Sequence, residues 1–186
     1  MSKIIAIIPA RGGSKRLPRK NILPMGVECI FVRQAKQLGL GHAVLCAERA
    51  VGKEPFAVLL ADDFLAENTV GAISDLTESF NKSGKSQLSV MEINGPDISK
   101  YGVVIPSKVG KGILGLIEKP SESEAPSNLA SIGRYVLTPN IFKTLKQLPA
   151  GVGGEFQLAD AINVLAQKGS VEAVRFRGIR FDCGSV

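Results

Sequence analysis

The stretch Lys3–Asn21 reads KIIAIIPARGGSKRLPRKN, an apolar run followed at once by a glycine pair and a cluster of cations. Five of the ten residues Arg11–Lys20 are Lys or Arg. Adjacent glycines let the backbone approach an anion closely, and unpaired N–H groups there form a concave anion site. A basic surface turn is the alternative, but like charges repel one another and such a turn needs no buried strand before it. The stretch therefore predicts a strand that leads into a loop built for a polyphosphate.

The overall composition is typical of a soluble globular chain with a single domain spanning residues 1–186. With 45% apolar and 22% charged residues, a chain of 186 residues can bury one core. The net charge of +6 is nearly matched by the five cations of the first loop, so the basicity is local. This favours a small anionic ligand over a nucleic-acid groove, as do the absence of Trp and of a basic stripe.

Neither a membrane nor a secretory location is indicated. No apolar run approaches the roughly 20 residues of a membrane span, and the N-terminus lacks the pattern of a signal peptide. The three cysteines, Cys29, Cys46 and Cys183, are odd in number and carry no metal-binding spacing. Reduced thiols in a cytoplasm are the simplest explanation.

Strand-like and helix-like segments alternate along the rest of the chain. The predicted strands are the runs 56–61, 87–93, 101–105, 113–117, 129–137 and 171–176. The predicted helices are 70–80 closed by Gly84, 141–148 opened by Pro139, and 156–165. This alternation predicts an α/β fold with a mostly parallel sheet flanked by helices, and a ligand site at the carboxyl ends of the strands.

Three aspartates follow predicted strands. Asp62 and Asp63 come directly after the run that ends at Ala61, and Asp182 follows a strand near the end of the sequence. An Asp in such a place is commonly only a turn or helix-cap residue. Carboxylates from two distant segments that meet over a phosphate loop are, however, what Mg²⁺ needs, because phosphate oxygens and water complete its octahedron. Together with the basic loop, these residues favour a Mg²⁺ site on Asp62 and Asp182.

From Val32 onward the sequence contains VRQ, LGLGHAVLCA, PFAVLLADD, YGVV, IEKP, APSNLASIGRYVLTP, GGEFQLADAI and FRGIRFDCG. In this order the motifs resemble the family of bacterial UTP–glucose-1-phosphate uridylyltransferases. The opening IIPARGGSKRLPRKN instead resembles the cytidylyltransferases that activate nine-carbon acidic sugars. Both resemblances imply a Rossmann-like nucleotidyltransferase fold with a mixed, mostly parallel sheet, and a Gly-rich loop that binds a nucleoside triphosphate.

The sequence departs from the family pattern in two places. Between Pro24 and Val32 the pattern would hold two further βα units, on the order of ~60 residues. Here Met25–Phe31 bridge that interval. After Val186 the family continues into a helix often used in assembly. We therefore expect a family segment to be missing near residues 24–31 and another after residue 186.

The resemblance also implies which residues bind the substrates. It places the uracil at Gln34 and Gly39, since a side-chain amide can pair with the base edge and a glycine admits that edge to the backbone. It places the glucose hydroxyls and the sugar phosphate at Gly102, Glu118 and Lys119. The remaining nucleotide-binding residues are Ala10, Arg11, Gly12, Gly13, Ser14 and Asp62.

Catalytic residues follow from the same resemblance. Lys20, Arg16 and Lys119 would neutralise phosphate charge, and Mg²⁺ on Asp62 and Asp182 would bridge the phosphates. The single histidine, His42, follows Gly41 at a predicted helix start. Its expected role is structural, because the nucleotidyl transfer that the resemblance implies needs no acid or base.

The implied activity is the formation of UDP-glucose and pyrophosphate from UTP and glucose 1-phosphate, by a homo-oligomer in the cytoplasm. A cytidylyltransferase for an acidic sugar is one alternative, supported by Arg11, Ser14, Lys20 and Asn21. A shortened domain that binds nucleotide or a partner without turnover is another, because the missing segment would supply part of the sheet.

Overall fold

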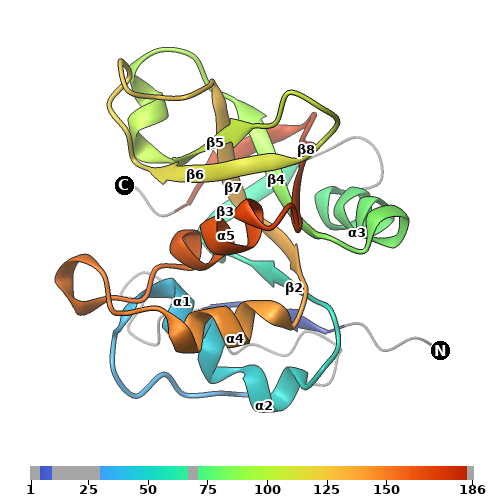
Figure 1. Cartoon of the computed structure of the whole chain (residues 1–186), viewed down its shortest axis with the longest axis vertical. Coiled ribbons are helices and arrows are strands. Elements are labelled where there is room, and N and C mark those ends of the chain that lie inside the picture. Colours follow the sequence, from blue (N-terminus) through green and yellow to red (C-terminus); the bar gives the residue numbers. More distant parts are fainter. Residues whose placement is uncertain (1–4, 10–29, 67–70, 184–186) are drawn as a thin grey trace.

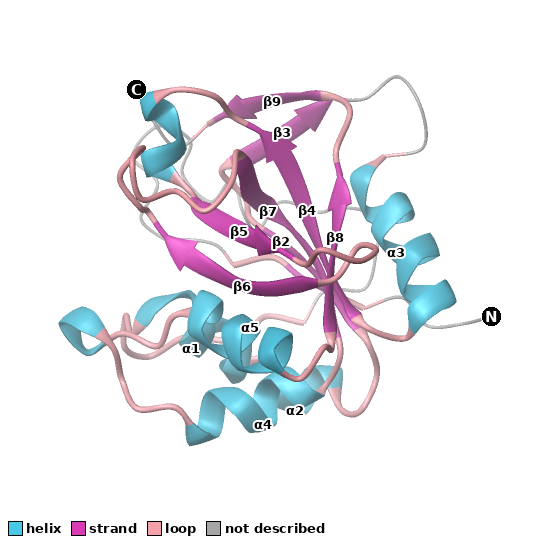
Figure 2. Ribbon diagram, turned by 45° about the horizontal axis from the view of Figure 1, so that its top comes forward, coloured by secondary structure: helices cyan, strands magenta, loops and turns pink. Residues whose placement is uncertain are grey.

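The computed structural model describes residues 5–9, 30–66 and 71–183. In this part of the chain a seven-stranded mixed sheet carries helices on both faces (Figures 1 and 2). The strands run in the spatial order β1 (Ala6–Ile7), β2 (Phe56–Leu59), β7 (Leu129–Leu137), β4 (Ser86–Glu92) and β8 (Val171–Arg175). A hairpin joins this row through β7, and it consists of β5 (Gly102–Pro106) and β6 (Ile113–Glu118).

The α/β class and the mixed sheet are confirmed, but the expectation of mostly parallel pairing is wrong. Among the described strands, β1 pairs parallel to β2 and β4 pairs parallel to β8, whereas β7 runs antiparallel to β2, β4 and β5. The chain enters β7 from the β5–β6 hairpin through the loop 119–128, which has no helix. A parallel connection needs a long crossover, and apolar runs alone do not reveal strand direction.

The helices cover the two faces unequally. On one face α1 (Gly39–Cys46), α4 (Asn140–Gln147) and α5 (Leu158–Gln167) pack together, with α2 (Glu48–Val51) directly after α1. On the other face α3 (Ala72–Ser83) packs against β4, β7 and β8 (Figure 2). Strand alternation explains both layers: Tyr135 and Leu137 of β7 join the main core, and Val136 between them faces the side where Leu76 of α3 is buried.

The three predicted helices are present, and α3 and α5 each begin two residues later than predicted. Gly84 ends α3 in the left-handed region with φ 68°, and its N–H donates to the Phe80 carbonyl at 2.7 Å. Pro139 directly precedes α4. Helix α5 begins at Leu158 and not at Phe156. The Phe156 N–H instead donates to the Leu38 carbonyl, and its own carbonyl accepts from Gly41, each at 2.8 Å.

A separate two-stranded antiparallel ribbon stands beside the sheet, formed by β3 (Asp63–Ala66) and β9 (Ile179–Asp182). Its register places Asp63 opposite Asp182, and the Cys183 N–H donates to the Asp62 carbonyl at 2.7 Å. The sequence pattern predicts neither strand, because four-residue segments with exposed aromatic residues show no buried run. The ribbon brings the segment after β2 against the segment after β8.

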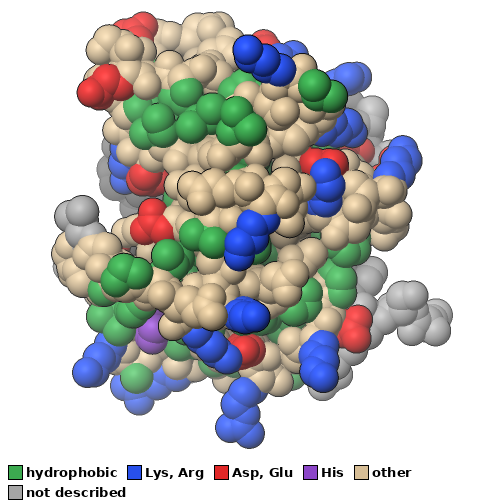
Figure 3. All heavy atoms as spheres, viewed as in Figure 1, with side chains coloured by type: hydrophobic (Ala, Val, Ile, Leu, Met, Phe, Trp, Pro, Cys, Tyr) green, Lys and Arg blue, Asp and Glu red, His purple; other side chains and the backbone are tan. Residues whose placement is uncertain are grey.

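Two 3₁₀ turns complete the described elements, η2 (Pro96–Lys100) and η3 (Val152–Gly154). Within the described ranges no helix combines the length and the apolar character that crossing a membrane requires. On the face shown in Figure 3, Lys and Arg side chains are spread among Asp and Glu and do not gather into one stripe.

Candidate active site

A cavity of about 330 Å³, here called the carboxylate cavity, lies where the ribbon, the β5–β6 hairpin, β7 and α5 meet. Its walls include the residues that the sequence assigned to the metal and to the sugar phosphate: Asp62, Gly102, Glu118, Lys119 and Asp182. These residues come from distant parts of the sequence. The fold therefore brings together every described residue that was expected to bind metal or sugar phosphate.

Asp62 and Asp182 approach this cavity from the two segments that the ribbon joins. Both residues are exposed, and the ribbon holds them through the Cys183 N–H bond to the Asp62 carbonyl. The Arg180 Nη2 atom lies 3.6 Å from Asp182 Oδ2. The described part of the chain contains no group of three or more His, Cys, Asp or Glu side chains suited to a metal. Two accessible carboxylates nevertheless fit Mg²⁺, which takes its other oxygens from phosphate and water.

Asp63, next to Asp62, has a structural role. Its side chain is buried, and its Oδ2 atom accepts from the Gly133 N–H at 2.9 Å, while Oδ1 forms an ion pair with Arg180. A Cβ atom at Gly133 would lie 2.5 Å from Asp63 Oδ2, so glycine is needed there. Both carboxylate oxygens are thus engaged, and Asp63 ties the ribbon to β7.

Arg180 links the two sides of the cavity. Its side chain is 13% exposed, its Nη1 atom donates to the Tyr101 hydroxyl at 2.7 Å, and its guanidinium lies 4.9 Å from the Tyr101 ring centroid. Burial lowers the pKa of Arg180, but the Asp63 charge and hydrogen bond outweigh it and hold the pKa above its ordinary value. Because Tyr101 directly precedes Gly102, Arg180 connects Asp63 of the ribbon with the end of the β5–β6 hairpin.

Arg134 supports the same wall from β7. Its Nη1 atom donates to the carbonyls of Leu60 at 3.0 Å and Gly133 at 2.8 Å, and its Nη2 atom donates to the Asp63 carbonyl. Burial lowers the pKa of Arg134, and the nearby Asp63 and Asp62 charges only partly oppose this. The turn that carries Asp62 is therefore fixed by hydrogen bonds from its backbone carbonyls to one half-buried guanidinium.

The part of the cavity predicted to bind the sugar phosphate is the strained end of the β5–β6 hairpin. Gly102 lies opposite Glu118 across the β5–β6 pair, and a Cβ atom at Gly102 would lie 3.1 Å from Glu118 Oε2. Lys119 has φ 48°, and its N–H donates to the Tyr101 carbonyl at 2.9 Å. A non-glycine residue in the left-handed region costs on the order of 1–3 kcal/mol, and such residues cluster at ligand sites. The geometry thus holds Glu118 and Lys119 side by side at the cavity.

The two residues expected to read the base also lie together. Gln34 Nε2 donates to the Gly39 carbonyl at 3.1 Å and lies 3.0 Å from His42 Nδ1. Gly39 has φ 86°, and a Cβ atom there would lie 2.9 Å from the Phe156 carbonyl oxygen. Leu40, the next residue, lines the carboxylate cavity. The predicted base site is therefore contiguous with the predicted metal and sugar sites.

The phosphate-loop residues Ala10, Arg11, Gly12, Gly13, Ser14, Arg16 and Lys20 lie outside the described residues, and their roles stay predictions. The strand that precedes the loop is confirmed, because β1 pairs parallel to β2 with Ile7 opposite Val58. Strand β1, which precedes the loop in the sequence, thus lies beside the strand that leads to Asp62.

The family model for nucleotidyl transferases matches residues 13–186. The chain belongs to the nucleotidyl transferase family. It is 43% identical over 163 residues to the UTP–glucose-1-phosphate uridylyltransferase of Pseudomonas aeruginosa, covering 84% of this chain and 58% of that protein. It is 42% identical over 175 residues to the enzyme of that name from Haemophilus ducreyi, covering 89% and 59%.

Solved structures agree with these relatives. A UDP-glucose pyrophosphorylase complexed with UDP-glucose is 40% identical with a TM-score of 0.77, over 83% of this chain and 60% of that one. The UTP-bound enzyme from Acinetobacter baumannii is 39% identical with a TM-score of 0.74, over 83% and 54%. The resemblance read from the motifs is confirmed. The chain spans a little under three-fifths of the length of these two curated relatives.

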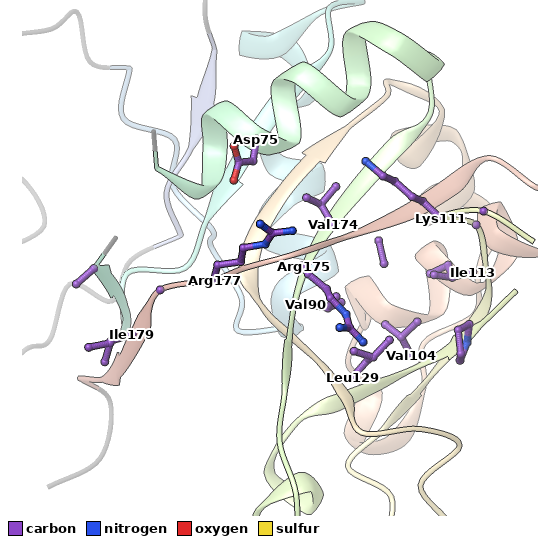
Figure 4. A pocket seen from close by; sticks show the side chains of 16 residues that line it. Asp75, Val90, Val104, Lys111, Ile113, Leu129, Val174, Arg175, Arg177 and Ile179 are labelled. Atoms are coloured by element: carbon purple, nitrogen blue, oxygen red, sulfur yellow. The ribbon is translucent and has the colours of Figure 1, made fainter. Parts of the chain in front are cut away.

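This nucleotidyl transferase has a second, larger hollow of about 850 Å³, here called the strand-edge groove, which contains none of the predicted site residues. Figure 4 shows the apolar side chains of Val90, Val104 and Leu129 there, with Arg175 and Arg177 nearby. The larger volume therefore does not coincide with the residues predicted from the motifs.

Sequence reasoning missed the residues that hold the nucleotidyl transferase site in shape, namely Arg180, Asp63, Gly133, Arg134 and Tyr101. All five lie inside or directly beside the motifs that carry the family resemblance. The motifs that contain these residues were recognised, but nothing in the sequence marked the five residues as structural supports of the site. Only their contacts show this role.

Proposed function

We propose that this chain transfers the uridylyl group of UTP to glucose 1-phosphate, forming UDP-glucose and pyrophosphate. The observation that carries the proposal is the carboxylate cavity, which is lined by the exposed residues Asp62 and Asp182 together with Glu118 and Lys119. The relatives named as uridylyltransferases support the same substrates. Cytidylyl transfer rests on the loop residues alone, and these relatives favour uridylyl transfer.

The reaction needs positioning and charge neutralisation more than proton transfer. A phosphate oxygen of glucose 1-phosphate would attack the α-phosphorus of UTP in line. The bond from that phosphorus to the β-phosphate oxygen breaks, and pyrophosphate leaves with its electrons. The nucleophile is already an anion, so the protein must hold two anions together and offset their repulsion.

The residues of the cavity and of the predicted phosphate loop would each have a separate role in this reaction. Asp62 and Asp182 would hold Mg²⁺, which when bound offsets triphosphate charge. Lys119 would orient the incoming sugar phosphate, and Glu118 would accept hydrogen bonds from glucose hydroxyls. Lys20 and Arg16 would stabilise charge on the leaving pyrophosphate.

The test is an end-point assay of the purified chain with UTP, glucose 1-phosphate and Mg²⁺, in which UDP-glucose and pyrophosphate are separated by anion-exchange chromatography. We expect both products in equal amounts. Parallel reactions contain CTP with a nine-carbon acidic sugar, or omit Mg²⁺. Product only with CTP would establish the cytidylyltransferase alternative and overturn the proposal.

A shortened nucleotide-binding domain without turnover is the second candidate, favoured by the short interval between Pro24 and Val32, where the family pattern would hold two further βα units of the sheet. A rise in melting temperature with UTP but no UDP-glucose would identify it, since ligand binding to the native state raises apparent stability. Assembly as a homo-oligomer in the cytoplasm belongs to the proposal too, and light scattering on the eluting protein tests the oligomeric state.

A further inference from the structure

The amide of Gln34 is fixed in one orientation. A backbone carbonyl can only accept a hydrogen bond, so the group that faces the Gly39 oxygen at 3.1 Å must be the amide nitrogen. The same nitrogen lies 3.0 Å from His42 Nδ1. The two N–H groups of Gln34 are thus shared between Gly39 and His42, and no described residue donates to its Oε1 atom.

This arrangement also fixes the state of His42. For Nδ1 to accept from Gln34 it must carry a lone pair, which requires the neutral tautomer with the proton on Nε2. An imidazolium would present a donor at Nδ1 and would favour the reversed amide. His42 therefore selects which end of the Gln34 amide is left for a ligand.

Packing keeps the ring in place. The centroid of the His42 ring lies 6.3 Å from that of Phe156, and Cys46 Sγ, one helical turn later, lies 3.8 Å from Nδ1. Gly41 N–H bonds the Phe156 carbonyl, and a Cβ atom at Gly41 would lie 2.6 Å from that oxygen. The start of α1 is thereby anchored, and the ring has little freedom to move away from Gln34.

We propose that His42 is a positioning residue that sets the preference for uracil by presenting the Gln34 carbonyl oxygen to the base. Uracil N3 carries a proton that this oxygen can accept. Cytosine N3 carries a lone pair in the same place, which the oxygen repels. The inference rests on the proposed function only in assigning the base to Gln34 and Gly39.

The first test needs no substrate. His42 is the only histidine of the chain, so a spectrum of the protein with ¹⁵N-labelled imidazole reports one ring. We expect a neutral ring protonated at Nε2 at neutral pH, and a changed Nδ1 signal in Gln34→Ala. A ring protonated at Nδ1, or one indifferent to Gln34→Ala, would overturn the inference.

The second test compares the binding of UTP and CTP by calorimetry, without glucose 1-phosphate. His42→Phe keeps the aromatic volume against Phe156 and removes the acceptor, so the UTP-over-CTP preference should fall about tenfold. His42→Asn places Oδ1 near the position of Nδ1 and should keep most of the preference. Arg49→Ala, a change at an exposed residue of the neighbouring helix α2, is the control and should leave the preference unchanged.

The outcomes separate this inference from the proposed function. An unchanged preference in His42→Phe, or no preference in the parent chain, refutes the role of His42. A parent chain that prefers UTP but forms no UDP-glucose refutes the proposed turnover and leaves the role of His42 standing. If His42→Phe does not fold, the labelled-ring spectrum and His42→Asn still decide.

Discussion

The carboxylate cavity contains the ion pair Arg180–Asp63, and Arg175 of the strand-edge groove forms an ion pair with Glu92. The two pairs differ in solvent access. The side chains of Arg180 and Asp63 are 13% and 7% exposed, whereas those of Arg175 and Glu92 are 62% and 47% exposed. The buried pair has further partners in Tyr101 and in the Gly133 N–H. The smaller hollow is therefore the one in which charged groups are desolvated and held in fixed directions.

The difference in burial between the two ion pairs explains how the ribbon is held beside the cavity. Bringing charges out of water is unfavourable unless hydrogen bonds satisfy them, so a buried ion pair is a costly feature with defined geometry. An exposed pair contributes little and can rearrange. The buried Arg180–Asp63 pair fixes the position of the ribbon, and the ribbon in turn positions Asp62 and Asp182.

The largest effect is expected from the carboxylates that face the cavity. Asp62→Asn and Asp182→Asn should each lower turnover by about three orders of magnitude, roughly 4 kcal/mol, because an amide is a poor Mg²⁺ ligand. Both residues are exposed, so the free energy of unfolding should change by less than about 0.5 kcal/mol. Steady-state rates and urea denaturation measure the two quantities. Asp75→Asn, in the strand-edge groove, is the control; full activity in Asp62→Asn would identify a turn residue.

The next prediction compares how much each ion pair contributes to the free energy of unfolding. Arg180→Met leaves the buried Asp63 carboxylate without its cation and should lower the free energy of unfolding by about 3–5 kcal/mol. Arg175→Met removes an exposed partner of Glu92 and should cost about 0–1 kcal/mol. Urea denaturation of both variants gives the difference. Equal losses would show that burial does not distinguish the two pairs.

The sequence predicted the elements that have a strong periodic pattern. The strand 129–137 matches β7 residue for residue, and Gly84 ends α3 as expected. Asp62, Gly102, Glu118, Lys119 and Asp182, predicted as one site from separate motifs, line one cavity. Asp62 and Asp182 could be predicted because carboxylates after strands are visible in the sequence, whereas Gly102, Glu118 and Lys119 were predicted from the motifs YGVV and IEKP that carry the family resemblance.

What the sequence could not predict depends on contacts between distant segments. The direction of β7 follows from the hairpin before it, and strand periodicity is the same in either direction. The β3–β9 ribbon exists only as a pair, since neither of its strands has a buried run. Asp62 and Asp63 look alike in sequence, yet one is exposed and the other is buried against Arg180. To distinguish the two aspartates, one must know the position of Arg180, which lies more than a hundred residues later in the sequence.

The smallest predicted effect concerns the backbone of Lys119. At φ 48° a side chain with a Cβ atom is strained, and glycine is not. Lys119→Ala and Lys119→Gly both remove the ammonium that would orient the sugar phosphate. Both should weaken glucose 1-phosphate binding by a similar factor, while Lys111→Ala in the strand-edge groove should not.

Their stabilities should differ, however. Lys119→Gly relieves the strain, and although glycine loses more entropy on folding, the Gly variant should be more stable than the Ala variant by about 1 kcal/mol. Urea denaturation of the pair measures this difference, and calorimetric titration with glucose 1-phosphate measures the shared loss of affinity. A Gly variant no more stable than the Ala variant would mean that the left-handed backbone at Lys119 costs nothing. In that case the hairpin end would be merely a turn, and the preorganisation inferred for the sugar side of the cavity would be wrong.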